Sequence, residues 1–197
     1  MSHTIYTTEG FILKSLNFGE ANKYFFIFTA EFGLIKAVAQ GIRHLKSKLR
    51  YSLEDLSFGQ VSVVRGREVW RITSAEKKLT LKDSKEVLLL ARIFSLLLRL
   101  LHGEERNDIL FDYLKQALNF LADYQKENEE KDEAILSSFE CILALRILSA
   151  LGYIGKLGDF DQFTKSSYFS PELLLSMSSL KSQAIMEINK SLQETHL

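Results

Sequence analysis

The sequence has little of the residues that staple small secreted proteins. Its 197 residues include one cysteine, Cys141, and one proline, Pro171. A single cysteine can form neither an internal disulfide nor a four-cysteine zinc site, which favours a reducing compartment. With 46% hydrophobic residues, a chain of this length can bury a core without such help. These features exclude the disulfide-rich, collagen-like and disordered classes.

Long hydrophobic runs are also missing. The most apolar stretch, residues 87–101, contains Arg92 and Arg99 and is shorter than the roughly 20 residues needed to cross a bilayer. The first ten residues are polar and lack the apolar centre of a signal peptide. We therefore expect no membrane contact and a cytoplasmic location.

Net charge is zero over the chain, with 25 basic and 25 acidic residues, but the two signs are unevenly spread. Residues 1–85 hold 14 basic and 8 acidic residues, a net charge of +6. The remainder therefore holds 11 basic and 17 acidic residues, a net charge of −6. This asymmetry predicts that the basic half meets a polyanion.

The basic half is built from short β-branched and aromatic runs separated by glycines. These runs predict strands at residues 11–13, 24–28, 34–38, 61–64 and 69–72. Five short strands without long intervening helices favour an antiparallel barrel, whose closure removes exposed edges. We expect a barrel of the OB type.

The acidic half has the longer apolar period of helices. Helices are predicted at residues 86–101, 108–124 and 133–151, with a short one from Glu172 and a last one at 180–192. Asn107 or Asp108 is expected to cap the second helix and Asp132 the third. The predicted fold class is therefore α+β, with a five-stranded OB-type β-barrel at residues 1–82 followed by an all-helical domain at 83–197.

Catalytic signatures are missing. The chain has no phosphate-binding loop, no zinc-protease helix and no nucleophile elbow, and its four histidines are scattered. The neighbouring carboxylates Glu104 and Glu105 are expected to be solvated rather than paired for acid–base work. We expect no enzymatic activity, no cofactor and no metal.

The informative cluster is basic. No acidic residue lies between Glu31 and Glu54, and the basic residues in this interval are Lys36, Arg43, Lys46, Lys48 and Arg50. A loop of cations without counter-charges can neutralise phosphates and release their counterions, although it can equally be a solvated loop. Three aromatic residues could stack on bases, namely Phe18, Tyr24 and Tyr51. Others are expected in the core, namely Phe25, Phe26, Phe28, Phe32 and Trp70.

Several segments together resemble the RecO family of bacterial recombination mediators. In the basic half these are TEGFILKS at 8–15, GEANK at 19–23, FTAEFG at 28–33, AVAQGIR at 37–43, RGR at 65–67 and TSAE at 73–76. In the acidic half they are LFDYL at 110–114 and LGY at 151–153. The order and spacing fit the family over most of the chain.

The resemblance implies an OB-fold that binds single- and double-stranded DNA, and a helical domain that meets protein partners. It implies annealing of complementary strands, and help to a RecA-type recombinase in replacing single-strand-binding protein together with a RecR-like mediator. It also implies association with the nucleoid. Lys14 and Lys23, in the matched segments, join the expected DNA-binding set. That set is Lys14, Lys23, Lys36, Arg43, Lys46, Lys48 and Arg50.

Two features depart from the family pattern. Many RecO-like proteins carry a four-cysteine zinc site soon after the LGY element, whereas residues 155–163 contain no cysteine. The last residues, 194–197, lack the basic ending usual in the family. The basic residues that bind the acidic tail of single-strand-binding protein have no match before Leu145, and Arg146 is a nearby candidate.

Two other functions fit the same residues. An OB-barrel that binds RNA would use the same basic strip and aromatic faces. A protein-interaction scaffold would leave residues 36–50 as a solvated loop. We keep both as alternatives.

Overall fold

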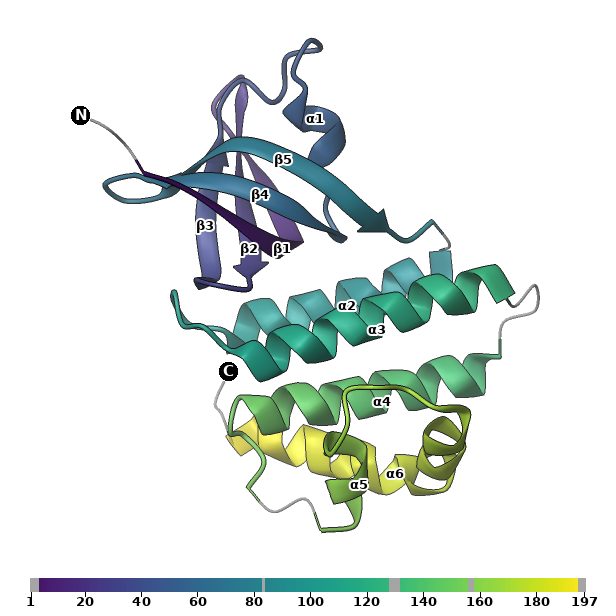
Figure 1. Ribbon diagram of the computed structural model, residues 1–197. Coiled ribbons are helices and arrows are strands. Elements are labelled where there is room, and N and C mark those ends of the chain that lie inside the picture. Colours follow the sequence, from purple (N-terminus) through teal and green to yellow (C-terminus); the bar gives the residue numbers. More distant parts are fainter. Residues whose placement is uncertain (1–3, 83, 128–131, 156–157, 195–197) are drawn as a thin grey trace. The chain divides into compact units, whose positions relative to one another are not determined.

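The computed structural model describes residues 4–82, 84–127, 132–155 and 158–194 (Figure 1). The chain divides into two compact units. The first, the barrel unit, comprises residues 1–82 and 90–106, and the second, the helical unit, comprises residues 83–89 and 107–197. The sequence predicted one domain boundary at residue 82. In the structure, residues 90–106 also group with the barrel.

Five strands form the barrel unit, in agreement with the predicted five-stranded sheet. They are β1 (Ile5–Phe18), β2 (Asn22–Thr29), β3 (Gly33–Ala39), β4 (Ser57–Arg65) and β5 (Trp70–Thr80). The sheet closes into a barrel in the order β1-β2-β3-β5-β4, with β3 and β5 parallel and the other neighbours antiparallel. β1 and β5 extend well beyond the predicted apolar runs, because the ladder also includes polar residues that face outward.

Alternating side chains fill the interior of the barrel. Phe25, Ile27 and Ile35 are fully buried there with Val63, and Trp70 is 2% exposed. A bulge between Ile12 and Lys14 shifts the register of β1 against β2. A bulge inserts one unpaired residue, and β1 therefore turns Lys14 outward while Ile12 still faces the core.

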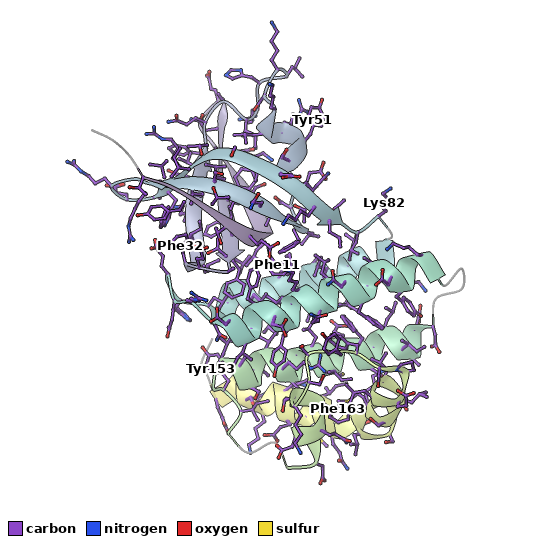
Figure 2. The ribbon with its side chains drawn as sticks, viewed as in Figure 1. Phe11, Phe32, Tyr51, Lys82, Tyr153 and Phe163 are labelled. Carbon is purple, nitrogen blue, oxygen red and sulfur yellow. The ribbon has the colours of Figure 1, made fainter. Side chains whose placement is uncertain are left out.

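The C-terminal part of α2 (Ser84–Leu100) belongs to the barrel unit because it covers one end of the barrel's outer surface. Phe11 points outward from β1, and its ring centroid lies 4.8 Å from Phe58 and 6.1 Å from Phe94 of the helix. All three rings are buried. Figure 2 shows Phe11 at this junction.

The loop after α2 is fixed to the barrel at two places. Gly33 has φ +65°, and a Cβ there would lie 2.1 Å from the carbonyl oxygen of Glu105. The Glu104 carboxylate accepts a hydrogen bond from the Trp70 indole at 2.8 Å and lies 3.2 Å from the Arg65 guanidinium. Glu104 is exposed, as predicted, and it also holds the Trp70 indole, a contact that the apolar pattern around Trp70 does not reveal.

The helical unit is built around α4 (Glu133–Ala150), which is buried along most of its length. Other helices of this unit in the described residues are α3 (Asp108–Glu127), the 3₁₀ helix η1 (Gly158–Phe160), the short α5 (Asp161–Thr164) and α6 (Pro171–Glu194). α4 packs against α3, α5 and α6. Asn107 caps α3 by accepting from the Leu110 N–H at 2.9 Å, and Asp132 caps α4 through the Ala134 N–H, as predicted.

α6 is one helix, where the sequence predicted two. The serine-rich stretch does not break it, and three of its hydroxyls bond to carbonyls within the helix. Ser176, Ser178 and Ser179 donate to the carbonyls three residues earlier at 2.7–2.9 Å. The described part of the chain contains no helix long and apolar enough to span a bilayer.

Candidate nucleic-acid interface

The uncovered outer surface of β1, β2 and β3 carries two rows of side chains that run across the strands. In the first row, Phe26 pairs with Lys14 on one side and Lys36 on the other. The second row runs from Leu16 through Tyr24 and Val38 to Arg71 on β5. Because neighbouring strands lie about 4.8 Å apart, side chains in such rows contact one another. We call these residues, together with Phe18, the outer strand face.

Aromatic rings occupy the centre of the outer strand face. The centroids of Phe18 and Tyr24 lie 4.3 Å apart with an interplanar angle of 37°. The Lys36 ammonium lies 4.3 Å from the centroid of the Tyr24 ring. Tyr24 is thus flanked from both neighbouring strands, while Phe18 is 45% exposed. Phe18 therefore offers more ring surface to a base than Tyr24 does.

Phe26 was predicted in the core but is only partly buried and lies on this outer face. The run from Tyr24 to Phe28 is aromatic or apolar at every position, because its inward residues fill the barrel core and Phe28, paired with the outward Phe11, is buried too. Hydrophobicity alone could not separate the two faces. Phe32 is also only partly buried, whereas the core predictions for Phe25, Phe28 and Trp70 are confirmed.

The basic loop between β3 and β4 is folded, and it contains α1 (Leu49–Ser52), a short helix that the sequence did not predict. Hydrogen bonds tie the loop to the turn between β1 and β2. The Gly41 N–H donates to Asn22 Oδ1 at 2.9 Å, and the Arg43 N–H donates to the Ala21 carbonyl at 3.0 Å. The Arg43 guanidinium also donates to the Gly19 carbonyl at 2.9 Å.

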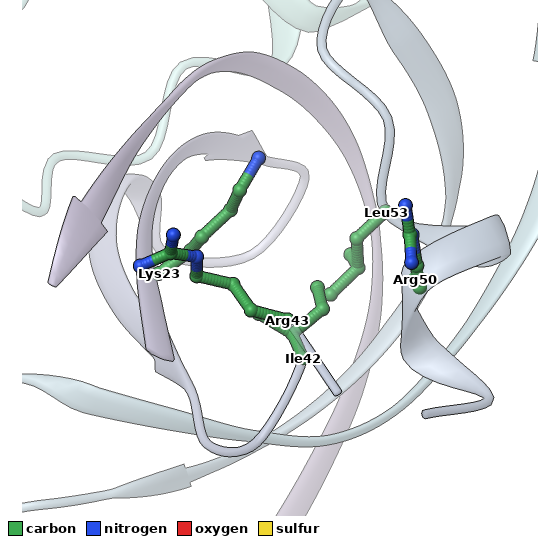
Figure 3. A pocket seen from close by; sticks show the side chains of 5 residues that line it. All are labelled: Lys23, Ile42, Arg43, Arg50 and Leu53. Carbon is green, nitrogen blue, oxygen red and sulfur yellow. The ribbon is translucent and has the colours of Figure 1, made fainter. Parts of the chain in front are cut away.

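A pocket of about 220 Å³ opens between this loop and β2 (Figure 3). We call it the mouth pocket, and its lining residues are Lys23, Ile42, Arg43, Arg50 and Leu53. Ile42 and Leu53 are buried members of the barrel core. Figure 3 shows Arg50 on α1, on the opposite side of Ile42 and Leu53 from Lys23 and Arg43. Three cations and an apolar floor thus face one small space.

The structure brings the predicted cations together on two connected surfaces. Lys14 and Lys36 lie on the outer strand face, and Lys23, Arg43 and Arg50 line the mouth pocket. Lys46 and Lys48 are exposed on the loop before α1. None of these seven side chains has an acidic partner among the residues that the structure describes.

Two lysines of β5, in contrast, are paired with carboxylates. Lys77 lies 2.7 Å from Glu54, and Lys78 lies 2.8 Å from Glu9. The hydrogen bond from Lys78 to Glu9 and the charge of that carboxylate raise the pKa of Lys78 above its ordinary value. The seven predicted cations thus differ from Lys77 and Lys78, whose charges are balanced within the barrel.

Sequence reasoning missed Arg71. Its Cα pairs with Val38 across the parallel β3–β5 contact, and its side chain is exposed. The signal that could have found it is alternation, since Trp70 and Ile72 on either side are buried. Tyr51, predicted as a stacking residue, is 70% exposed on α1 (Figure 2).

Arg146 does not supply an exposed cation. Its side chain is fully buried, and its guanidinium donates to the carbonyls of Phe163, Ser167 and Tyr168 at 2.7–2.9 Å. Burial lowers its pKa to about 10, so it stays protonated at neutral pH. The suggestion that Arg146 binds an acidic protein tail is therefore wrong, because its donors already serve the loop before α6.

Metal-binding groups do not gather in the described residues. No cluster of three or more His, Cys, Asp and Glu side chains is found there that could hold a metal ion. Cys141 is buried on α4, and burial raises the pKa of its thiol. The absence of zinc stays a prediction for the purified protein.

Comparison with known proteins adds to this geometry. Residues 1–79 match the family model described as "Recombination protein O N terminal". The "DNA repair protein RecO" of Alkaliphilus metalliredigens is 29% identical over 137 residues, which cover 68% of this chain and 54% of that protein. The protein of the same name from Dehalococcoides mccartyi strain CBDB1 is 27% identical, covering 85% of this chain and 66% of its own length.

A third RecO, from Gloeothece citriformis, is 42% identical over 76 residues, or 39% of this chain and 26% of its own length. This chain thus spans about half to two thirds of the length of the first two relatives. The barrel unit gives the family match, and the longer alignments extend it into the helical unit. The chain is therefore similar to RecO proteins, through its first 79 residues in the family model and over a longer span in the individual alignments.

Proposed function

We propose that this protein is a DNA-binding recombination mediator whose OB-type barrel binds single- and double-stranded DNA through the outer strand face and the basic loop. The observation that carries the proposal is the set of seven cations without acidic partners beside the exposed ring of Phe18. Unbalanced cations attract phosphates by releasing counterions, and exposed rings stack on unpaired bases. Similarity to RecO proteins supplies the role in recombination and repair.

The mediator acts by bringing strands together rather than by covalent chemistry. Two complementary strands repel each other, and a surface with several unbalanced cations lowers that repulsion while concentrating both strands. Base pairing then supplies the free energy of annealing. The protein assists a RecA-type recombinase on DNA covered by single-strand-binding protein, whose tail it binds, together with a RecR-like mediator. It does so in the cytoplasm, on the nucleoid.

The salt dependence of DNA binding tests the proposal. If Arg43, Lys46, Lys48 and Arg50 contact phosphates, their share of the slope of log affinity against log salt is roughly −3, from about −0.7 per phosphate on single strands. Replacing all four with Ala removes that share. An unchanged slope in the quadruple variant would reject these residues. No binding by the unaltered protein even at low salt would reject the proposal and favour a protein-interaction scaffold.

Two comparisons separate the mediator from simpler binding modules. Single-stranded DNA and RNA of the same sequence are titrated side by side, and tighter RNA binding would favour an RNA-binding OB module. Annealing is followed by fluorescence quenching between labelled complementary oligonucleotides. We expect acceleration by the protein that does not depend on ATP. Binding without any acceleration would indicate a plain DNA-binding module.

A further inference from the structure

The mouth pocket differs from the rest of the basic surface because it has walls. Lys23, Arg43 and Arg50 reach one space of about 220 Å³, and no acidic residue lines it. Three like charges around one space repel one another, so the arrangement gains stability when an anion enters. Lys46 and Lys48, in contrast, stand exposed on the loop and line no part of this pocket.

Two of the three cations have donors available for a ligand. The Arg50 side chain has no hydrogen-bond partner in the described part of the chain. Lys23 donates only a long bond, 3.4 Å to Ser15 Oγ, so its ammonium keeps two further donors. Arg43 is held in place by its bond to the Gly19 carbonyl. A planar guanidinium fork with free donors matches the oxygens of a phosphate.

The pocket is joined to the stacking ring through the turn between β1 and β2. Arg43 lines the pocket and bonds to Gly19, and Gly19 directly follows Phe18 in the chain. The buried side chains of Ile42 and Leu53 form an apolar floor, which suits the sugar beside a phosphate better than a second charge. A strand whose phosphate enters the pocket thus passes the turn that carries Phe18.

We propose that the mouth pocket is the seat of one internal backbone phosphate of a bound single strand, with the adjoining base stacked on Phe18. This inference rests on the proposed function and deepens it. It means that one nucleotide of the strand is held at a fixed position, whereas the rest of the surface attracts the strand only through its charge. Arg50 contacts the phosphate through its guanidinium fork, Lys23 contacts it as a point charge, and Arg43 positions the loop.

A substitution that keeps the charge separates a fixed seat from diffuse attraction. Arg50→Lys preserves the net charge but loses the two-pronged contact. We expect it to lower the affinity for an unphosphorylated single-stranded oligonucleotide about fivefold to tenfold at an unchanged salt slope, because one charge-assisted hydrogen bond is lost. Arg67→Lys, the same exchange at an exposed arginine between β4 and β5 that lies outside the proposed binding set, leaves the affinity unchanged.

Double variants test whether the cations share one phosphate. Residues that contact the same group are coupled, and distant ones act independently. Combining Lys23→Met with Arg50→Ala should reduce affinity less than the product of the two single losses. Combining Lys46→Ala with Arg50→Ala should give the product. Urea unfolding of each variant checks that the barrel is intact, which is expected because the Arg50 side chain makes no hydrogen bond or ion pair in the described residues.

The outcomes separate the two proposals. The phosphate seat does not exist if Arg50→Lys binds DNA as tightly as the unaltered protein and if each double variant loses affinity by the product of its two single losses. The proposed DNA binding would still stand. Oligonucleotides carrying a 5′ phosphate, a 3′ phosphate or neither complete the test. If Arg50→Lys lowers the affinity only for an oligonucleotide with a terminal phosphate, the pocket does not bind an internal phosphate. Equal losses of affinity for all three oligonucleotides support the internal phosphate. No binding of any strand at low salt overturns the function itself.

Discussion

Arg50 in the barrel unit and Arg146 in the helical unit are the same residue type used in opposite ways. Arg50 is exposed beside a pocket, and its side chain has no hydrogen-bond partner among the described residues. Arg146 is fully buried, and all its bonded donors face backbone carbonyls. A cation whose donors are used by the protein stabilises the fold, and one whose donors are free is available to a ligand. Counting charges cannot make this distinction.

The comparison predicts that altering Arg146 damages the fold and spares binding. Arg146→Met leaves three carbonyls without their donor and should lower the free energy of unfolding by on the order of 3 kcal/mol. Urea denaturation measures this loss. The salt slope of DNA binding by the folded fraction should not change.

Lys165→Met is the matched control for Arg146, because this lysine is exposed on the same segment. It should stay within about 0.5 kcal/mol of the unaltered protein. A stable Arg146→Met protein would break the comparison, since it would mean that the loop carbonyls find water or other donors.

Altering the unpaired cations should lower DNA affinity and leave stability nearly unchanged, the reverse of the effect at Arg146. The quadruple Ala variant of Arg43, Lys46, Lys48 and Arg50 should lose about a hundredfold or more in affinity for single strands at low salt, since four phosphate contacts are removed. Its free energy of unfolding should change by less than about 1 kcal/mol, because only Arg43 gives up a hydrogen bond within the protein. If the variant keeps its affinity for DNA but has a much lower free energy of unfolding, these cations stabilise the loop rather than bind DNA.

The sequence predicted the barrel strands well because glycine turns and β-type runs are local signals. It also predicted which segment is basic, since a run without acidic residues is visible in one dimension. It could not predict pairing. Lys78 and Glu9 are distant in sequence and meet only because β1 and β5 flank β4 in the barrel. The burial of Arg146 could not be predicted for the same reason, because its carbonyl partners are distant in sequence.

Phe18 sharpens the comparison between exposed and buried rings. Phe18→Ala removes a stacking surface worth about 1–3 kcal/mol per base, so the affinity for single strands should fall about fivefold or more. Binding of duplex DNA should fall less, because its bases are already stacked. Leu16→Ala, on the same face of β1, is the control without a ring. Equal losses for both variants would mean that the face contributes apolar area rather than stacking.

The smallest effect is expected at Lys78, whose charge is already balanced by Glu9. Lys78→Ala changes the net charge as much as Lys46→Ala does. Only the latter should reduce the salt slope for single strands, by about 0.7, because a paired cation releases no counterion from DNA. The two variants are compared in one titration series. Equal salt slopes would mean that only the net charge matters for DNA binding, and not whether a cation is paired.

The pairing of Lys78 can be checked independently by pH. Glu9 raises the pKa of Lys78 in the folded protein, so the pair's contribution to stability is fully present below the pKa of the unfolded chain, about 10.4. It is lost as the pH rises through the higher folded-state pKa. The stability difference between the unaltered protein and Lys78→Ala should therefore hold constant from pH 7 to about 10 and shrink above it. A difference that already shrinks below pH 9 would show that Glu9 does not hold Lys78, and its charge would then be as available to DNA as that of Lys46.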